Sequence, residues 1–357
     1  MTDPSSLADF GGWPSILGAL TRGRNLSAAE AGAALREILE GAATSAQIAA
    51  FCVALRMKGE TVEEMSGLLG TMLEYAERVP LPAGLAVVDT CGTGGDRSHT
   101  INVSTTAALV VAGAGAPVCK HGNRAATSRS GSADVLEALG VTVDLGPEGV
   151  ARCVQEVGMG FCFAPRFHAA LRHAGPTRRE LGVPTVFNFL GPLANPARAR
   201  RQALGVSDPG MAERMVGVLA ANGAERALVV YGHDGLDELS TGTTSTVIDL
   251  RDGDVRTYVV DPAGLGLAHS SPEALRGGDA ATNAALTRRV LEGERGPHRD
   301  FVLLNSAAGV VAAGLADDLA EGLEAAVASI DEGKAAAVLE GLVRVSGEQA
   351  RASGGSG

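Results

Sequence analysis

The first 80 residues show the alternation of apolar and polar positions that is typical of amphipathic helices. Two helix starts are marked by capping boxes, in which a hydroxyl and a carboxylate three residues later satisfy two backbone donors. These pairs are Ser27 with Glu30 and Thr61 with Glu64. No strand pattern occurs in this region, so residues 1–80 are predicted to form a small helical domain.

A third helix is predicted for the sequence QIAAFCVALRMK, with Ser45 as its N-terminal cap and Gly59 just after its last turn. A segment rich in proline and glycine follows at residues 80–84 and separates this region from a different pattern. We interpret this segment as a hinge between two domains.

From residue 85 onward, short apolar runs alternate with stretches long enough for helices. This alternation predicts an α/β domain with a largely parallel sheet. Alanine-rich stretches between residues 301 and 342 are expected to be helical, and the tail RASGGSG, residues 351–357, is expected to be flexible. The predicted strands are LAVVDT, PVCK, VTVDL, GFCFA, RQALGV, RALVVYG and STVIDL.

Composition places the chain among ordinary globular proteins. It has 357 residues, of which 45% are hydrophobic and 20% charged, and this balance favours neither a disordered chain nor a membrane protein. The longest nearly uncharged apolar run, residues 107–119, is too short for a bilayer, which needs about 20 residues. The N-terminus has no secretory signal pattern, so we expect a cytoplasmic protein without membrane contact.

Charge narrows the range of partners. The net charge is -11 and aromatic residues make up 3%, so a nucleic-acid surface is not expected. An anionic ligand must therefore be held by a local arrangement of amides, cations or a metal ion. The five cysteines form no CxxC pair and are predicted to be buried thiols rather than disulfides or zinc ligands.

A glycine-rich segment, DTCGTGGDRSHTINVSTT at residues 89–106, lies between a predicted strand and a predicted helix. Its glycines let the backbone turn and present amides, and the following helix adds a positive partial charge. Phosphate is therefore the expected ligand. The segment is not a Walker A loop, because no Gly-Lys-Ser/Thr follows, and not a dinucleotide fingerprint, because the third glycine would fall at Arg97. The alternative is a plain turn capped by Asn102 or Ser104.

A second polar loop, KHGNRAATSRSGS at residues 120–132, also lies between a predicted strand and a helix. It gathers cationic side chains and hydroxyls, including Lys120, one of only three lysines in the chain. Such loops are often simply solvated. Because both polar loops follow successive strands of one sheet, we expect them to meet at its carboxyl edge, where ligands of open α/β sheets bind.

An acidic loop, GHDGLDELSTGTT at residues 232–244, follows another predicted strand. Asp237 and Glu238 are candidate ligands for Mg²⁺, which takes one or two carboxylates and otherwise water or phosphate oxygens. The alternative is a solvated acidic loop.

A fourth segment, residues 163–196, contains Arg178 and Arg179 in front of a predicted helix, where they are placed to clamp a carboxylate. His168 and His173 are five residues apart, and this spacing disfavours a helical metal pair.

Six longer motifs occur along the chain in the same order as in one known family. They are GTGGD at 92–96, NVSTTAA at 102–108, KHGNRAATSRSGSADVLEALG at 120–140, GPTRRELG at 175–182, FNFLGPLANPA at 187–197 and DGLDE at 234–238. Together they resemble the anthranilate phosphoribosyltransferase family, and the resemblance covers roughly residues 12–345.

The resemblance implies a small helical N-terminal domain, with a further contribution from about residues 175–200, joined by hinges to a larger α/β domain. That larger domain, residues 85–174 and 201–350, would bind the phosphoribosyl donor on a mostly parallel central sheet similar to that of nucleoside phosphorylases. The resemblance also implies a homodimer formed through the helical domains.

The implied reaction is the Mg²⁺-dependent transfer of phosphoribose from phosphoribosyl pyrophosphate to the amine of anthranilate, a step of tryptophan synthesis. The implied metal ligands are Ser104, Asp237 and Glu238, and the implied anthranilate contacts are Gly92, Asn123 and Arg178. The implied donor-binding residues are Gly92, Gly95, Asp96, Thr100, Asn102, Val103, Ser104, Thr105, Lys120, His121, Gly122, Asn123, Arg124, Ala125, Ala126, Thr127, Ser128 and Ser132.

The chemistry of the residues agrees with this reaction. Cleavage of the anomeric C–O bond places negative charge on pyrophosphate, so catalysis needs an anion trap and a metal more than a strong nucleophile. No residue stands out as a general base, and positioning by Lys120 and Arg178 is expected to dominate. The alternatives are a pyrimidine nucleoside phosphorylase and a non-catalytic paralogue that binds nucleic acid, which the net charge of -11 disfavours.

Overall fold

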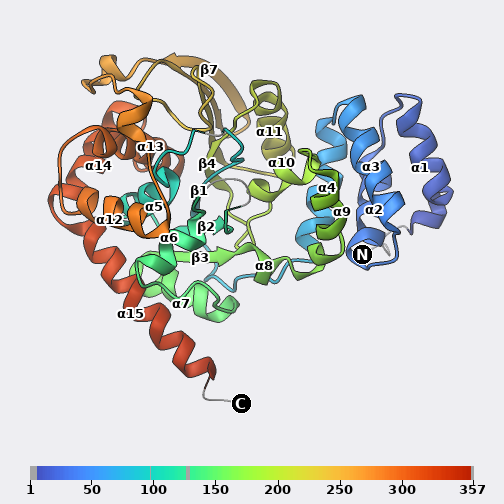
Figure 1. Cartoon of the computed structure of the whole chain (residues 1–357), viewed down its shortest axis with the longest axis horizontal. Helices are drawn as coiled ribbons and strands as arrows, with labels where there is room; N and C mark the ends of the chain where they lie inside the picture. Colours follow the sequence, from blue (N-terminus) through green and yellow to red (C-terminus); the bar gives the residue numbers. More distant parts are fainter. Residues whose placement is uncertain (1–5, 97, 126–128, 355–357) are drawn as a thin grey trace.

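The computed structural model describes residues 6–96, 98–125 and 129–354 and consists of a helical region beside a larger α/β region (Figure 1). Helices α1 to α4 gather at one end of the molecule, and a seven-stranded sheet lies near its middle. This arrangement confirms the predicted fold class. Within the described ranges, no helix has both the length and the apolar character to cross a membrane.

The helical region begins with a short 3₁₀ turn and contains no strand among residues 6–79. Its helices pack on one another through a core of leucine, isoleucine, methionine and aromatic side chains. Its elements are η1 (Leu7–Phe10), α1 (Gly12–Thr21), α2 (Ala28–Leu39), α3 (Ser45–Lys58) and α4 (Val62–Glu74).

The two predicted capping boxes are present. The Ser27 hydroxyl accepts from the backbone N–H of Glu30, and Thr61 accepts from the N–H of Glu64. The predicted cap of α3 is wrong by one residue, because Thr44 is the cap and Ser45 is the first helical residue. Thr44 forms its own box with Gln47, a partner at the N3 position that Ser45 does not have.

The sheet has the strand order β3-β2-β1-β4-β5-β6-β7. The first five strands in this order are parallel, and β6 and β7 are antiparallel additions at one edge. The strands are β1 (Val88–Gly92), β2 (Val118–Gly122), β3 (Met159–Phe163), β4 (Arg201–Gly205), β5 (Arg226–Gly232), β6 (Ser245–Arg251) and β7 (Asp254–Val260).

Two strand predictions need correction. The sequence VTVDL, residues 141–145, forms no strand, and the Thr142 N–H donates to the Ser346 hydroxyl of the last helix at 3.0 Å instead of to a neighbouring strand. Strand β7 was not predicted, because its side chains are almost all exposed and show no buried face. The hairpin turn before it has positive φ angles at Asp252 and Gly253, and an Asp-Gly pair between two strands favours this geometry.

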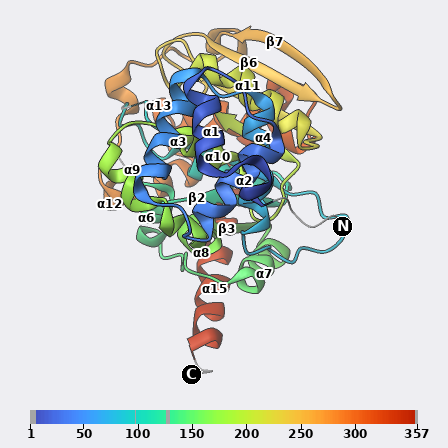
Figure 2. The ribbon, with the colours of Figure 1, turned by 90° about the vertical axis from the view of Figure 1, so that its right-hand side faces the viewer.

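The two faces of the sheet carry different helices (Figures 1 and 2). On β5, Leu228 and Val230 join a core that includes α5 and α13, whereas Ala227 and Val229 join the core of α11 and the helical region. This alternation follows from the two-residue period of a strand. The helices from α5 to α10 are α5 (Val103–Gly113), α6 (Ser132–Ala138), α7 (Pro147–Val157), α8 (Ala164–Phe167), α9 (Gly175–Leu181) and α10 (Val186–Leu193), with the 3₁₀ turn η2 (Ala169–His173) between α8 and α9.

The C-terminal third of the chain is mainly helical. Residues 351–354, which were expected in a flexible tail, belong to the last helix, and residues 355–357 lie outside the described ranges. Figure 1 shows this helix projecting away from the body of the protein. The remaining elements are α11 (Pro209–Ala221), η3 (Pro262–Leu265), η4 (Pro272–Leu275), α12 (Ala280–Leu291), α13 (Pro297–Ala313), α14 (Leu319–Asp331) and α15 (Lys334–Gly354).

Candidate active site

The loops that follow β1 and β5 meet at the carboxyl edge of the sheet. The backbone N–H of Gly94 donates to Oδ2 of Asp237 at 2.6 Å, and the N–H of Thr93 donates to the carbonyl of Gly205 at 2.9 Å. Lys120 on β2 reaches the same place, since its Nζ lies 3.3 Å from the hydroxyl of Ser104. These contacts join residues of the first three predicted segments.

Glycines in the first loop and at the end of β4 permit close packing and an unusual backbone conformation. A Cβ atom on Gly92 would lie 2.5 Å from Oδ2 of Asp237, and one on Gly205 would lie 1.6 Å from the Asp237 carbonyl. Gly95 has a φ of 87°, a backbone conformation that favours glycine. These positions allow the acidic loop to approach the backbone of β1 and β4.

The polar residues after these glycines are held by the protein itself. Asp96 accepts from the backbone N–H and the hydroxyl of Ser98, and Thr100 forms an isolated bridge with Arg276. The side-chain cap that belonged to the alternative interpretation does not form, because Asn102 occupies the cap position without a capping hydrogen bond. Arg97 lies outside the described residues.

The Asn102 side chain links three separate segments. Its Nδ2 donates to the carbonyl of Ser130 at 3.0 Å, and its Oδ1 accepts from Nδ2 of Asn283 at 2.7 Å. Asn283 lies on α12 and was not found from the sequence, because nothing near it marks its partner 181 residues away. The two asparagines fix the junction between the first and second polar loops.

Helix α5 starts directly after the first loop, and its N-terminus points back toward it. Val103 is its first residue, and Ser104 and Thr105 follow. The Thr105 hydroxyl is buried and has no hydrogen-bond partner among the described residues. An anion at this helix start would face backbone N–H groups and the positive end of the helix dipole.

Only 1% of the Lys120 surface is exposed, which is unusual for a lysine. Its Nζ donates to the carbonyl of Thr90 and to the Ser104 hydroxyl. The buried carboxylate of Asp89 lies on the adjacent strand and accepts from the N–H of His121 at 3.1 Å and from Nδ2 of Asn195 at 2.8 Å. Burial raises the pKa of Asp89, and the nearby Lys120 opposes that rise.

Two buried histidines, His121 on β2 and His168 just after α8, lie close together with their rings tilted by 52°. The rings of His121 and His168 are 5.1 Å apart, and their Nδ1 and Nε2 atoms lie 3.1 and 2.9 Å from the carbonyls of Gly191 and Ala194. Burial lowers the pKa of His121 to about 3, with help from His168, and that of His168 to about 4. Both rings are therefore neutral at pH 7, and His121 Nε2 is left buried without a hydrogen-bond partner among the described residues.

The acidic residues of the third loop are crowded. Burial raises the pKa of Asp237 to about 7, and the nearby Asp96 adds to the shift. Burial and the charges of Asp237 and Asp96 also raise the pKa of Glu238, whereas Lys120 lowers it. Such crowding of carboxylates favours a cation between them.

The crowded carboxylates fit Mg²⁺. The described residues contain no cluster of three or more aspartate, glutamate, histidine or cysteine side chains that could bind a metal ion by itself. Mg²⁺ needs only one or two protein carboxylates, because it keeps water and binds substrate phosphates. Asp237 and Glu238 supply that number, and the Ser104 hydroxyl is a further oxygen donor that Lys120 already links to the site.

Described residues on both sides of the second loop contact Asp134 of α6. The backbone N–H groups of Ala125 and Gly131 donate to Oδ2 of Asp134 at 3.0 and 2.8 Å, and the Arg124 guanidinium pairs with Asp134 and Glu137. Arg124 is thus held by acidic side chains, while its neighbour Asn123 is exposed. Gly122 ends β2 and Ser132 begins α6. The predicted donor residues Ala126, Thr127 and Ser128 lie outside the described ranges.

Arg178 lies inside the short helix α9, not in front of a helix as expected. Its guanidinium lies 5.0 Å from the ring centre of Phe187, and burial lowers its pKa. No acidic side chain in the described ranges forms an ion pair with it. A mostly buried cation without a protein counter-ion is suited to bind a carboxylate.

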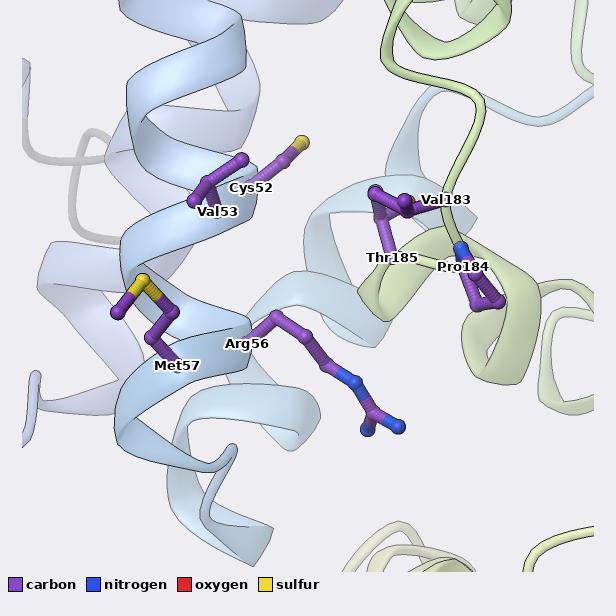
Figure 3. Close-up of a pocket in the computed structure, with 7 residues that line it drawn as sticks. All are labelled: Cys52, Val53, Arg56, Met57, Val183, Pro184 and Thr185. Atoms are coloured by element: carbon purple, nitrogen blue, oxygen red, sulfur yellow. The ribbon is translucent and has the colours of Figure 1, made fainter.

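A cavity of about 270 Å³ lies where α3 faces the segment between α9 and α10 (Figure 3). It is apart from the polar loops, and its wall includes exposed apolar side chains. The cavity is lined by Cys52, Val53, Arg56, Met57, Val183, Pro184 and Thr185.

The five cysteines are free and buried, as predicted.

Two family models match the chain. The model described as "Glycosyl transferase family, helical bundle domain" matches residues 14–76, and "Glycosyl transferase family, a/b domain" matches residues 84–336. Among curated proteins, anthranilate phosphoribosyltransferase of Rhodococcus jostii is 58% identical over 333 residues, 92% of this chain and 91% of the relative. That of Salinispora arenicola is 55% identical over 340 residues, 93% of this chain and 96% of the relative.

Solved structures agree with these relatives. Anthranilate phosphoribosyltransferase from Thermus thermophilus has a TM-score of 0.88 at 42% identity and covers 93% of this chain and 99% of its own. The Saccharomyces cerevisiae enzyme in complex with PRPP and Mg has a TM-score of 0.85 at 29% identity, and the match covers 94% of this chain and 98% of the yeast chain. The same yeast enzyme has been solved with 4-fluoroanthranilate, at 27% identity and a TM-score of 0.85, and that match covers 96% of this chain and 99% of the yeast chain.

Proposed function

Because the chain belongs to the anthranilate phosphoribosyltransferase family, we propose that the polar edge of its sheet binds phosphoribosyl pyrophosphate and presents it to anthranilate. The chain transfers the phosphoribosyl group to the amine of anthranilate and releases pyrophosphate, a reaction of tryptophan biosynthesis. The observation that carries the proposed site is the meeting of the Gly94 amide, Lys120 and Asp237 at one edge. We also propose that the reaction takes place in the cytoplasm.

Pyrophosphate is the leaving group, and the proposed role of the loops is to hold it. The backbone amides after β1 and the start of α5 face an anion with fixed positive partial charges. Lys120 adds a full positive charge that the Thr90 carbonyl and Ser104 keep in place. The proposed donor-binding residues are those named from the sequence: Gly92, Gly95, Asp96, Thr100, Asn102, Val103, Ser104, Thr105, Lys120, His121, Gly122, Asn123, Arg124, Ala125, Ala126, Thr127, Ser128 and Ser132.

We propose Asp237, Glu238 and Ser104 as the residues that hold Mg²⁺. When bound, the ion would neutralise negative charge that develops on pyrophosphate. Burial raises the pKa values of Asp237 and Glu238, the charges of neighbouring carboxylates add to both shifts, and this crowding supports the assignment.

We propose that Arg178 binds the carboxylate of anthranilate, with Asn123 and Gly92 as further contacts. The guanidinium offers two parallel N–H donors, which match the two oxygens of a carboxylate. The neutral imidazoles of His121 and His168 are weak bases, because burial lowers their pKa values to about 3 and about 4, far below the pH at which a general base works best. Positioning and stabilisation of the leaving group then account for the rate.

The proposal is tested by following anthranilate fluorescence after addition of phosphoribosyl pyrophosphate, first with Mg²⁺ and then with EDTA. We expect the signal to decay and pyrophosphate to appear only when the metal is present. Unchanged fluorescence with bound donor and Mg²⁺ would show that anthranilate is not the acceptor. Full turnover in EDTA would show that the reaction does not need the metal ion.

We propose that two copies associate through the face around the cavity of Figure 3. Three apolar side chains are exposed there, Val53 at 36%, Met57 at 83% and Val183 at 55%. Exposed apolar side chains that gather on one face support an interface there. Its position on α3 and the α9–α10 segment agrees with a homodimer formed through the helical regions.

Met57→Glu should convert the dimer to a monomer, because it places a charge in the centre of the proposed contact. Light scattering coupled to gel filtration would report the mass. Leu315→Glu is the matched control, since Leu315 is 51% exposed on the turn after α13, away from this face. A wild-type protein that is already monomeric would refute the dimer, and equal masses for all three proteins would refute this face.

A further inference from the structure

Asn305 lies on α13, beneath the acidic loop and outside the residues assigned to the site so far. Its side chain is buried, with 7% of the residue exposed. Its Oδ1 accepts from the N–H of Leu239 at 2.9 Å, and its Nδ2 donates to the carbonyl of Leu239 at 3.0 Å. The second Nδ2 proton goes to the carbonyl of Phe301 at 3.0 Å, one turn earlier on α13.

This contact fixes the backbone immediately after the acidic pair. Leu239 follows Glu238, so its N–H belongs to the peptide group that joins the two residues. Because one planar amide holds both the N–H and the C=O of Leu239, it restricts the peptide planes on either side, as a neighbouring strand would. The Leu239 side chain is itself fully buried, and its packing further restricts movement of the loop backbone.

The opposite side of the acidic loop is fixed by different contacts. The Gly94 N–H holds the Asp237 carboxylate at 2.6 Å, and Gly205 allows the Asp237 carbonyl to lie against β4. The Asp237 carboxylate is thus held at β1, and the backbone from Asp237 to Leu239 lies between β4 on one side and α13 on the other. Asn305 is the α13 contact in this arrangement.

We propose that Asn305 is a positioning residue that holds Asp237 and Glu238 in the geometry required to bind a divalent cation together with phosphoribosyl pyrophosphate. The proposal rests on the function proposed above. Neighbouring carboxylates repel one another, so the loop needs an anchor that does not depend on the cation. Hydrogen-bonding partners behind metal ligands typically change metal affinity by about 10- to 100-fold when they are removed.

Asn305→Thr separates the loop contact from the helix contact. A threonine hydroxyl is able to bond the carbonyl four residues earlier, as Ser306 already does with Val302 at 2.7 Å. The variant therefore keeps a bond to Phe301 and loses both bonds to Leu239. Ser306→Ala is the matched control, because it removes a buried hydrogen bond from the same helix without touching the loop.

Calorimetric titration of Mn²⁺ into protein that is saturated with phosphoribosyl pyrophosphate, without anthranilate, measures the effect independently of turnover. We expect Asn305→Thr to weaken Mn²⁺ binding about 10-fold or more, and Ser306→Ala to leave it within about twofold of wild type. In steady-state assays, the Mg²⁺ concentration for half-maximal rate should rise by a similar factor, while the KM for anthranilate stays unchanged.

Equal Mn²⁺ affinities in Asn305→Thr and Ser306→Ala, with wild-type protein active, would overturn the positioning role and leave the proposed function intact. Wild-type protein that binds Mn²⁺ and donor but does not consume anthranilate would overturn the proposed function instead. If Asn305→Thr does not fold, Asn305→Ala is measured, because it also removes both bonds to Leu239. Wild-type Mn²⁺ affinity in this variant would also overturn the inference.

Discussion

Replacing both acidic residues of the third loop, Asp237→Asn with Glu238→Gln, should raise the Mg²⁺ requirement and lower kcat/KM for the donor by about 100-fold or more. Both changes are nearly isosteric, so the close approach of the loop to Gly92 and Gly205 is preserved. These changes remove the two carboxylate charges that we propose bind the cation. Initial rates measured over a wide range of Mg²⁺ concentrations would show the shift directly.

The matched control is Asp252→Asn with Asp254→Asn, which removes two acidic charges from the exposed β6–β7 turn. Asparagine tolerates the positive φ of 51° at position 252, so the turn should persist. The control should have the wild-type Mg²⁺ dependence. If the acidic-loop variant shares that dependence, these carboxylates do not hold the metal.

The double change should also increase the stability of the protein without ligands. Burial, and then repulsion between neighbouring carboxylates, raises the pKa values of Asp237 and Glu238 in the folded state, and neutral amides remove the charges that both effects penalise. Strain of this kind at an active site is expected where binding geometry is selected over stability. Loss of activity with retained or higher stability would therefore separate a functional role from a structural one.

The position of the site was predictable from the sequence because local chemistry marks it. Glycines and hydroxyls follow β1, a rare lysine lies on β2, and an acidic pair follows β5. Parallel strands bring their carboxyl ends to one edge, so three separate loops had to converge. The contact between Gly94 and Asp237, 143 residues apart, is the result.

The residues that hold the site in place were not predictable in this way. Asn195, Asn283 and Asn305 reach partners 106, 181 and 66 residues away, and each is a single amide in an otherwise apolar or helical stretch. Local pattern cannot report such contacts, because the partner is chosen by tertiary packing. Strand β7 is different, since the Asp-Gly pair before it was a usable hairpin signal.

Arg178→Ala should raise the KM for anthranilate by about 30-fold or more, because losing one partner of a buried charge pair costs about 2 kcal/mol or more. Its KM for phosphoribosyl pyrophosphate should change little, since no described contact joins Arg178 to the first loop. Arg178→Lys tests geometry, because lysine keeps the charge but loses the two parallel donors. We expect it to recover only part of the affinity, and steady-state kinetics with each substrate varied in turn would measure both effects.

Arg179→Ala is the control for the charge and for the helix. Arg179 is the next residue on α9 and is exposed, so its loss changes net charge and helix propensity by the same amount as the loss of Arg178. The Arg178 guanidinium also packs on Phe187, and a general loosening of α9 would raise both KM values together. A rise confined to anthranilate in the Arg178 variant, with wild-type kinetics in the Arg179 variant, identifies a carboxylate contact. Equal effects in the two variants would mean that Arg178 serves the packing of α9 on α10, and that another group recognises the acceptor.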